Sequence, residues 1–156
     1  LSLPAAALLR ESPLPALGSR VLEAWTDGAS RGNPGPAAIG VLFRQQGGPD
    51  LCTHRATIGR VTNNVAEYRA ALRALEFARD WGVERLELCL DSELIVRQLN
   101  GVYQVKSLDL RPLHQQALDL ARDLRGFRVR HVPREQNRQA DLLANLALDG
   151  VPEGRA

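Results

Sequence analysis

Four acidic residues stand where an α/β fold would gather them. Asp27 and Asp91 each close an apolar run, and Glu67 and Asp141 each lie near the start of a helical segment. Strand ends and helix starts meet along one edge of such a sheet, which is the usual place for ligand sites. Grouped carboxylates repel one another unless a cation neutralises them, and their hard oxygen ligands favour Mg²⁺ or Mn²⁺. The pattern therefore predicts two divalent metal ions, which about 4 Å apart would serve in-line phosphoryl displacement by water.

Each carboxylate taken alone also has an ordinary structural explanation. Turn formation, helix capping and the helix dipole all place acidic side chains at such positions. The explanations are a turn at Asp27-Gly28, a strand end beside the cap Ser92 for Asp91, a capping box from Asn64 to Glu67, and a favourable dipole position for Asp141. Only the four together, within their flanking motifs, favour a metal site.

The hydrophobic pattern predicts the elements that position these residues. Apolar or alternating runs indicate strands at 21–27, 36–44, 50–59, 85–90 and 127–132. Helical periodicity marks 65–81, a segment from the cap Ser92 to Gly101, the segment 110–124, and a last helix from about Asn137. The resulting order βββαβααβα predicts a mixed sheet whose parallel partners are covered by helices.

The length of the chain sets its domain organisation. With 156 residues, 44% of them hydrophobic, it can bury one core but not two independent ones. We expect a loosely ordered N-terminal arm over residues 1–19, one domain over 20–149 and a C-terminal tail over 150–156. No run approaches the roughly 20 apolar residues that span a bilayer, so no membrane association is expected.

Charge and cysteine content say little about partners. The formal charge of +2 and the pI of about 8.9 neither require nor exclude nucleic acid. Cys52 and Cys89 lie in strand-like runs and suit small buried thiols better than a disulfide. We therefore expect a reducing, cytoplasmic compartment.

The sequences around the carboxylates form motifs that are more specific than the carboxylates themselves. They are TDGASRGNPGP at 26–36, TNNVAE at 62–67, Asp91-Ser92, and Asn137 with Asp141 four residues later. In this order and spacing they closely resemble the type 1 ribonuclease H family, over about residues 21–148. The resemblance implies the ribonuclease H fold, an α/β architecture with a five-stranded mixed sheet of order 3-2-1-4-5 and helices on both faces.

The same resemblance implies an activity. Such proteins hydrolyse the RNA strand of RNA/DNA hybrids with two metal ions, leaving 5′-phosphate and 3′-hydroxyl ends. By that analogy Asp27 bridges both metals, and Asp141 serves the metal that activates water. Glu67 and Asp91 hold the other metal. The implied partner is an RNA/DNA hybrid, and we expect a monomer.

Three asparagines resemble the family's minor-groove contacts. Asn33, Asn63 and Asn64 occupy the matching positions. Amide groups can donate to and accept from base edges and 2′-hydroxyls. Ordinary turn and cap chemistry is the alternative explanation for all three.

Further contacts to the hybrid can be carried over by position. Arg60 and Thr62 resemble the pocket that grips a phosphate of the DNA strand, and Ser107 stands where many members have asparagine. A solvated surface arginine and a helix-cap threonine are the alternatives for Arg60 and Thr62. The segment 101–106 is short where better-known bacterial members insert a basic protrusion, so the chain resembles the compact subgroup without it. Affinity would then rest on the groove itself, with Lys106 contributing.

Two residues are candidates for the product-release group, a histidine in many members. His131 lies ten residues before Asp141, but it alternates within a strand, and Pro133 stiffens the segment that follows. Arg134, seven before Asp141, lies beyond the proline and can act on a phosphate through its permanent charge. We favour Arg134, with a plain surface arginine as the alternative.

Two other functions compete with hydrolysis of hybrids. A catalytically silent module that binds hybrids or RNA would gain by losing negative charge, which the intact set of carboxylates argues against. A transposase-like or junction-cutting nuclease would need further partner-binding regions, for which this chain has little room.

Overall fold

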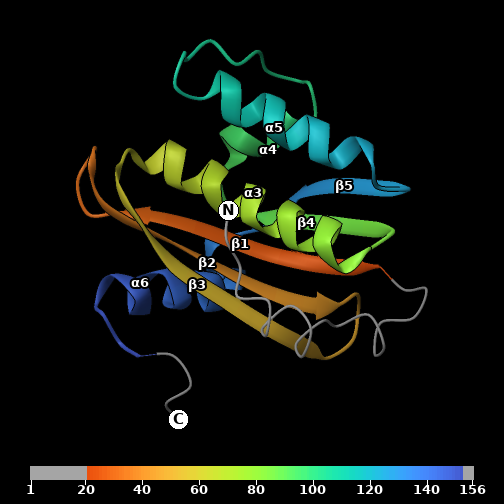
Figure 1. The fold of residues 1–156 in the computed structure, drawn as a ribbon, viewed down its shortest axis with the longest axis horizontal. Coiled ribbons are helices and arrows are strands. Elements are labelled where there is room, and N and C mark those ends of the chain that lie inside the picture. Colours follow the sequence, from red (N-terminus) through yellow and green to blue (C-terminus); the bar gives the residue numbers. More distant parts are fainter. Residues whose placement is uncertain (1–20, 153–156) are drawn as a thin grey trace.

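Five strands and the helices between them follow the predicted order in the computed structural model, which describes residues 21–152 (Figure 1). The strands are β1 (Leu22–Ser30), β2 (Gly35–Gln45), β3 (Asp50–Val61), β4 (Arg85–Leu90) and β5 (Gly126–His131). The helices are α3 (Asn63–Trp81), α4 (Glu93–Leu99), α5 (Arg111–Arg122) and α6 (Arg138–Leu148), with a short 3-10 helix, η1 (Arg134–Gln136), before α6. The predicted arm over 1–19 lies outside the described residues, as do residues 153–156 of the predicted tail.

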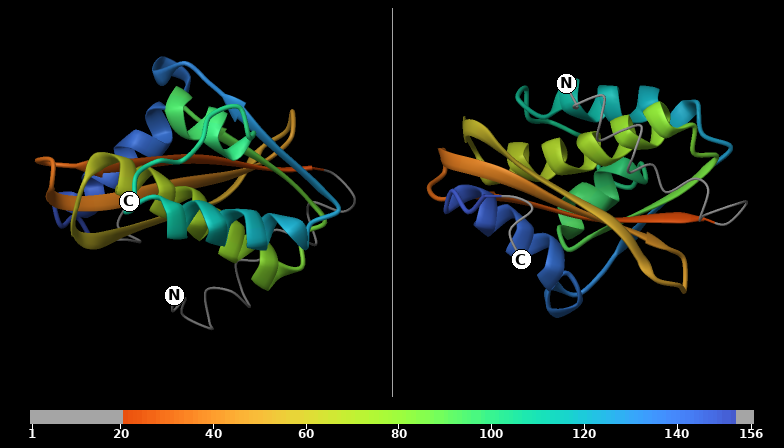
Figure 2. Two further views of the ribbon diagram at one scale, coloured as in Figure 1. Left: turned by 90° about the horizontal axis from the view of Figure 1, so that it is seen from above. Right: turned by 60° about the horizontal axis from the view of Figure 1, so that its bottom comes forward.

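The sheet has the predicted order β3-β2-β1-β4-β5. Its first three strands form an antiparallel meander, and β4 and β5 continue the sheet in parallel with β1. Helix α3 lies on one face with α4 and α5, and α6 lies on the other face (Figures 1 and 2). The predicted mixed sheet with helices on both faces is thus confirmed. Between residues 21 and 152, no helix is both long and apolar enough to cross a membrane.

The main core lies between the sheet and α3. Phe43 of β2 meets Phe77 and Trp81 of α3 edge to face, with ring centroids 5.5 and 4.9 Å apart. Small side chains on the same helix allow it to approach the sheet closely. Four alanines spaced four residues apart are fully buried on this side: Ala66, Ala70, Ala74 and Ala78.

Local capping explains where the helices begin and end. Helix α3 starts two residues before the predicted position because the hydroxyl of Thr62 accepts from the Val65 N–H at 3.3 Å. Gly82 ends α3 in the left-handed conformation, with φ 72°, as predicted. Ser92 caps α4 as predicted, by accepting from the Ile95 N–H at 3.4 Å.

Strand β1 runs beyond the predicted turn at Asp27-Gly28, so that part of the prediction is wrong. Asp27 pairs with Gly40, and the antiparallel ladder continues to Ser30. The chain does not turn because β2 keeps supplying partners for the backbone of β1. On the other side of β1, the ladder with β4 ends at the pair of Trp25 with Cys89.

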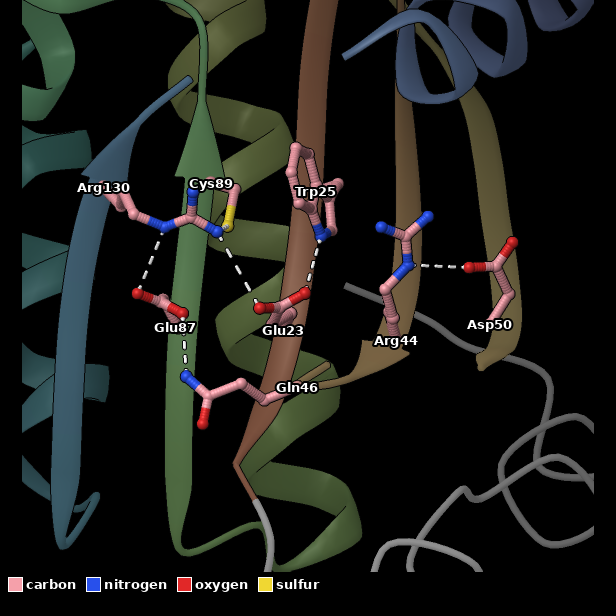
Figure 3. A network of polar contacts seen from close by, with 8 residues as sticks. All are labelled: Glu23, Trp25, Arg44, Gln46, Asp50, Glu87, Cys89 and Arg130. Atoms are coloured by element: carbon pink, nitrogen blue, oxygen red, sulfur yellow. Dashed lines mark hydrogen bonds and ion pairs between the residues drawn. The ribbon is translucent and has the colours of Figure 1, made fainter. Parts of the chain in front are cut away.

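A polar layer covers part of the sheet face that α6 also occupies (Figure 3). Arg130 of β5 contacts Glu87 of β4 through Nε and Oε1 at 3.3 Å, and Glu23 of β1 through Nη2 and Oε2 at 3.8 Å. The indole N–H of Trp25 also donates to Glu23, at 3.1 Å. Glu23 and Glu87 are only 7% and 4% exposed, so the charge of Arg130 compensates two buried carboxylates.

Replacing Arg130 by alanine should destabilise the fold by about 3 kcal/mol, because two buried carboxylates would lose their countercharge. Urea unfolding followed by circular dichroism would measure the loss. Arg122→Ala is the matched control, since Arg122 pairs with Asp119 at 3.1 Å while both side chains are more than half exposed. That control should cost less than about 1 kcal/mol. Equal losses in the two variants would show that the layer around Arg130 does not carry this stability.

Candidate active site

Three of the four predicted carboxylates meet where β1 and β4 separate. One oxygen from each of Asp27, Glu67 and Asp91 lies within 4.8 Å of the others. Asp27 and Glu67 are 8% and 6% exposed, and Asp91 is half-buried directly after β4. The fold thus brings together acidic residues that are far apart in the sequence.

Gly28 allows α3 to bring Glu67 against β1. A Cβ at residue 28 would collide with the backbone of Ala66 and Glu67, so the approach requires glycine. The Gly28 N–H donates to Glu67 Oε1 at 2.7 Å. Glu67 was predicted in the first turn of α3 but lies in the second, because the helix begins already at Asn63. The alternative capping box from Asn64 to Glu67 is wrong, because Thr62 is the cap and Glu67 is bound to β1.

Asp141 reaches the group from α6, on the other face of the sheet. It lies in the first turn of that helix, as predicted. Helix α6 can pack closely on β2 because Gly40, the ladder partner of Asp27, has no side chain to collide with the backbone of Ala140. A side-chain hydrogen bond with Asp141 contributes to raising the pKa of Asp27. Asp141 thus borders the closest set of oxygens, while Asn145 donates to its Oδ1 at 3.3 Å.

The electrostatics of the site are those of excess negative charge. Burial raises the pKa of Asp27 far above its usual range, and the charges of Glu67 and Asp91 raise it further. Burial also raises the pKa of Glu67, although the hydrogen bond from the Gly28 N–H opposes this. A group of oxygen ligands with this much repulsion fits a hard divalent cation such as Mg²⁺ or Mn²⁺.

Asn137 makes hydrogen bonds in the site that could not be predicted from the sequence. Its amide donates to the Thr26 carbonyl at 2.9 Å and to Asp91 Oδ2 at 3.1 Å. The sequence offered one signal, since Asn137 belongs to the same motif as Asp141. A motif does not reveal which way a side chain points, so these contacts required the structure.

The predicted minor-groove asparagines lie at neighbouring loop and helix-start positions. Asn33, Asn63 and Asn64 are all exposed, and the Asn63 N–H donates to Asn33 Oδ1 at 3.1 Å. This bond ties the β1–β2 loop to the start of α3. The structure therefore brings Asn33 and Asn63 together, with their surface open to a ligand.

The other predicted contacts to the hybrid lie on two separate segments. Arg60 is exposed near the end of β3, and Thr62 caps α3, so the helix-cap explanation of Thr62 holds for its oxygen. The Thr62 hydroxyl hydrogen is still able to donate. Lys106 and Ser107 are exposed between α4 and α5, and the Ser107 carbonyl accepts from the N–H groups of Leu110 and Arg111. Their roles as substrate contacts stay predictions.

The two product-release candidates differ in their relation to the carboxylates. The charge of Arg134, at the start of η1, is close enough to Glu67 to lower the pKa of that carboxyl. His131 is exposed at the end of β5, where it pairs with Leu90, the residue before Asp91. A strand position of this kind is what the alternating sequence predicted for His131.

Comparisons with known proteins match residues 25–147 to the family described as Reverse transcriptase-like. The Ribonuclease HI of Halobacterium salinarum is 46% identical over 135 residues, which cover 86% of this chain and 67% of that protein. A bifunctional protein of Mycobacterium tuberculosis is 42% identical over 137 residues. Those residues cover 87% of this chain but only 37% of the mycobacterial protein.

Solved structures give the same assignment. The crystal structure of the ribonuclease H1 from Halobacterium salinarum superposes with a TM-score of 0.81 and 44% identity, covering 84% of this chain and 99% of that one. The structure of LC11-RNase H1 in complex with an RNA/DNA hybrid has a TM-score of 0.78 and 42% identity, covering 83% and 97%. The family match and these identities, over nearly all of the sheet and its helices, show that this chain belongs to the type 1 ribonuclease H family.

Proposed function

We propose that this chain hydrolyses the RNA strand of RNA/DNA hybrids with two divalent metal ions, leaving 5′-phosphate and 3′-hydroxyl ends. The observation that carries the proposal is the buried group of Asp27, Glu67 and Asp91, with Asp141 at its border. A relative named Ribonuclease HI and a similar protein solved with an RNA/DNA hybrid support the substrate. A silent binding module is a poorer explanation, because a phosphate binder would gain affinity by losing these charges.

The four carboxylates would hold the metal ions. Bound there, divalent ions would activate a water and stabilise the leaving oxygen of a phosphodiester. We assign Asp27 to both ions because it lies within 4.8 Å of Glu67 and Asp91 and also hydrogen-bonds Asp141. Asp141 would bind the ion that activates water, and Glu67 and Asp91 would bind the other ion. Mg²⁺ is the proposed ion, and Mn²⁺ suits the same ligands.

Groups around the carboxylates would position the hybrid. The exposed amides of Asn33, Asn63 and Asn64 can pair with base edges and 2′-hydroxyls in a minor groove. Arg60, Thr62, Lys106 and Ser107 would contact phosphates of the strands. A monomeric state and a cytoplasmic location stay predictions.

Incubation with labelled RNA/DNA hybrid, duplex DNA and duplex RNA, each with Mg²⁺ or with EDTA, tests the proposed function. We expect cleavage of the RNA strand in the hybrid, and only when Mg²⁺ is present. Binding of the hybrid without cleavage would favour the silent module. Cleavage of duplex DNA in preference to the hybrid would favour a different nuclease.

Replacing Asp27 by asparagine should abolish cleavage and raise the melting temperature of the metal-free protein. Asparagine carries no charge, so the variant neither buries a carboxylate beside Glu67 and Asp91 nor takes up a proton on folding. The pKa of Asp27 is raised above its ordinary value of 3.8, so the wild type loses stability as the pH rises from that ordinary value to the raised one. The thermal advantage of Asp27→Asn in EDTA should therefore grow from acidic to alkaline pH.

Glu93→Gln is a control for the removal of a carboxylate near the site, since Glu93 is exposed and pairs with Arg97 at 2.7 Å. It should leave the melting temperature and its pH dependence close to those of the wild type. Near-native Mg²⁺-dependent turnover by Asp27→Asn would refute the metal assignment.

Replacing both Arg60 and Thr62 by alanine should weaken hybrid binding and reduce its salt dependence, because one phosphate contact would be lost. Binding would be measured by fluorescence anisotropy over a series of salt concentrations. Thr62→Ala also removes a helix cap, so one control is Thr62→Ser, which keeps the capping oxygen. Arg79→Ala, at the opposite end of α3, should leave binding unchanged. Unchanged affinity and salt slope in the double variant would remove both residues from the contact.

Arg134→Ala should lower turnover on a hybrid at every pH, because a guanidinium acts by charge and not by proton transfer. His131→Ala should change turnover little. Steady-state kinetics of both variants across pH provide the measurement. A large loss confined to the histidine variant would reverse the assignment, and unchanged rates in both would show that product release needs neither side chain.

A further inference from the structure

The ladder between β1 and β4 stops just before the site. Its last pair is Trp25 with Cys89. Beyond that pair, β1 continues along β2 through Asp27, and β4 continues along β5 as far as the residue before Asp91. The two strands that carry Asp27 and Asp91 therefore lack backbone pairing with each other at this point. Backbone pairing therefore does not hold Asp27 and Asp91 directly against each other.

The side chain of Asn137 bridges the two strands where the ladder ends. Its Nδ2 donates to the carbonyl of Thr26, the residue before Asp27, at 2.9 Å, and to Asp91 Oδ2 at 3.1 Å. Both groups are acceptors, so only the NH₂ end of the amide can face them. Asn137 is 1% exposed, which means that water does not compete for these bonds.

Asn137 is also the N-cap residue of α6, the helix that carries the fourth carboxylate. Its carbonyl accepts from the Asp141 N–H at 3.2 Å, the first hydrogen bond of that helix. Its Oδ1 is buried and has no hydrogen-bond partner among the described residues. A buried acceptor of this kind costs stability. The two hydrogen bonds that the amide donates therefore set its orientation, although this orientation leaves Oδ1 without a partner among the described residues.

We infer that Asn137 is a positioning residue that sets the spacing of Asp27 and Asp91 and thereby increases the affinity of the site for a divalent cation. The hydrogen bond to Oδ2 restrains the Asp91 carboxylate and leaves Oδ1 available to a metal. Hydrogen bonds to ligating carboxylates commonly tune metal affinity in this way. The inference rests on the proposed metal-dependent function and assigns it a residue beyond the carboxylates.

Titration calorimetry of Asn137→Ala with Mg²⁺, and separately with Mn²⁺, tests the inference without any nucleic acid. The dissociation constant should rise about 10- to 100-fold. In cleavage assays, KM for the hybrid should stay near the wild-type value, while the Mg²⁺ concentration needed for half-maximal kcat should rise. A residue that only supports the fold would not shift metal dependence selectively.

Asn100→Ala is the matched control. Asn100 also donates its amide to a strand carbonyl, that of Val129 at 3.3 Å, but from the end of α4. It should bind Mg²⁺ like the wild type. Asn137→Ser retains one donor and serves where the alanine variant does not fold, and it should give a smaller loss of affinity.

Wild-type Mg²⁺ affinity in a folded Asn137 variant would overturn the inference, as would an equal loss in Asn100→Ala. Failure of the proposed function has a different signature. If the wild type binds Mg²⁺ in an Asn137-dependent manner but leaves RNA/DNA hybrids intact, the inference stands and the proposed function fails.

Discussion

Repulsion among buried carboxylates is the constraint on which the functional end of this sheet depends. Three acidic oxygens lie within 4.8 Å of one another, and burial with mutual repulsion raises the pKa of both Asp27 and Glu67. Burying these carboxylates without a countercharge costs the folded state stability. A bound cation reverses this balance, because it binds the folded state and stabilises it by mass action. The proposed metal binding therefore accounts for an arrangement that folding alone disfavours.

At the other end of β1 and β4, the charges of two buried carboxylates are compensated in a different way. Glu23 of β1 and Glu87 of β4 are also buried, and there the guanidinium of Arg130 lies between them (Figure 3). Four residues further along each strand, Asp27 and Asp91 lie at the site. The donors described for the site are neutral: the Gly28 N–H to Glu67, the Asn137 amide to Asp91 and the Asn145 amide to Asp141. Neutral donors orient carboxylates without cancelling their charge, which leaves that charge for a metal.

Periodicity and short motifs were sufficient for the fold and for the choice of carboxylates, but not for their local geometry. The alanine stripe of α3 and the strand ending before Asp91 could be predicted because each depends on nearby residues. The extension of β1 past Asp27-Gly28 could not, because it depends on pairing with β2, and Gly40 is distant in sequence. Likewise, a capping box and a bond to Gly28 are equally compatible with the sequence around Glu67, and only packing of α3 on β1 decides between them.

We propose that the fold holds Asp27, Glu67 and Asp91 together as ligands of a divalent cation. Anomalous diffraction from crystals of the wild-type protein grown with MnCl₂ would locate that cation. We expect an anomalous peak within bonding distance of oxygens from all three side chains, and its loss in crystals of Asp27→Asn. An ordered site without a peak, with the three carboxylates still in place, would refute the assignment of these residues as metal ligands.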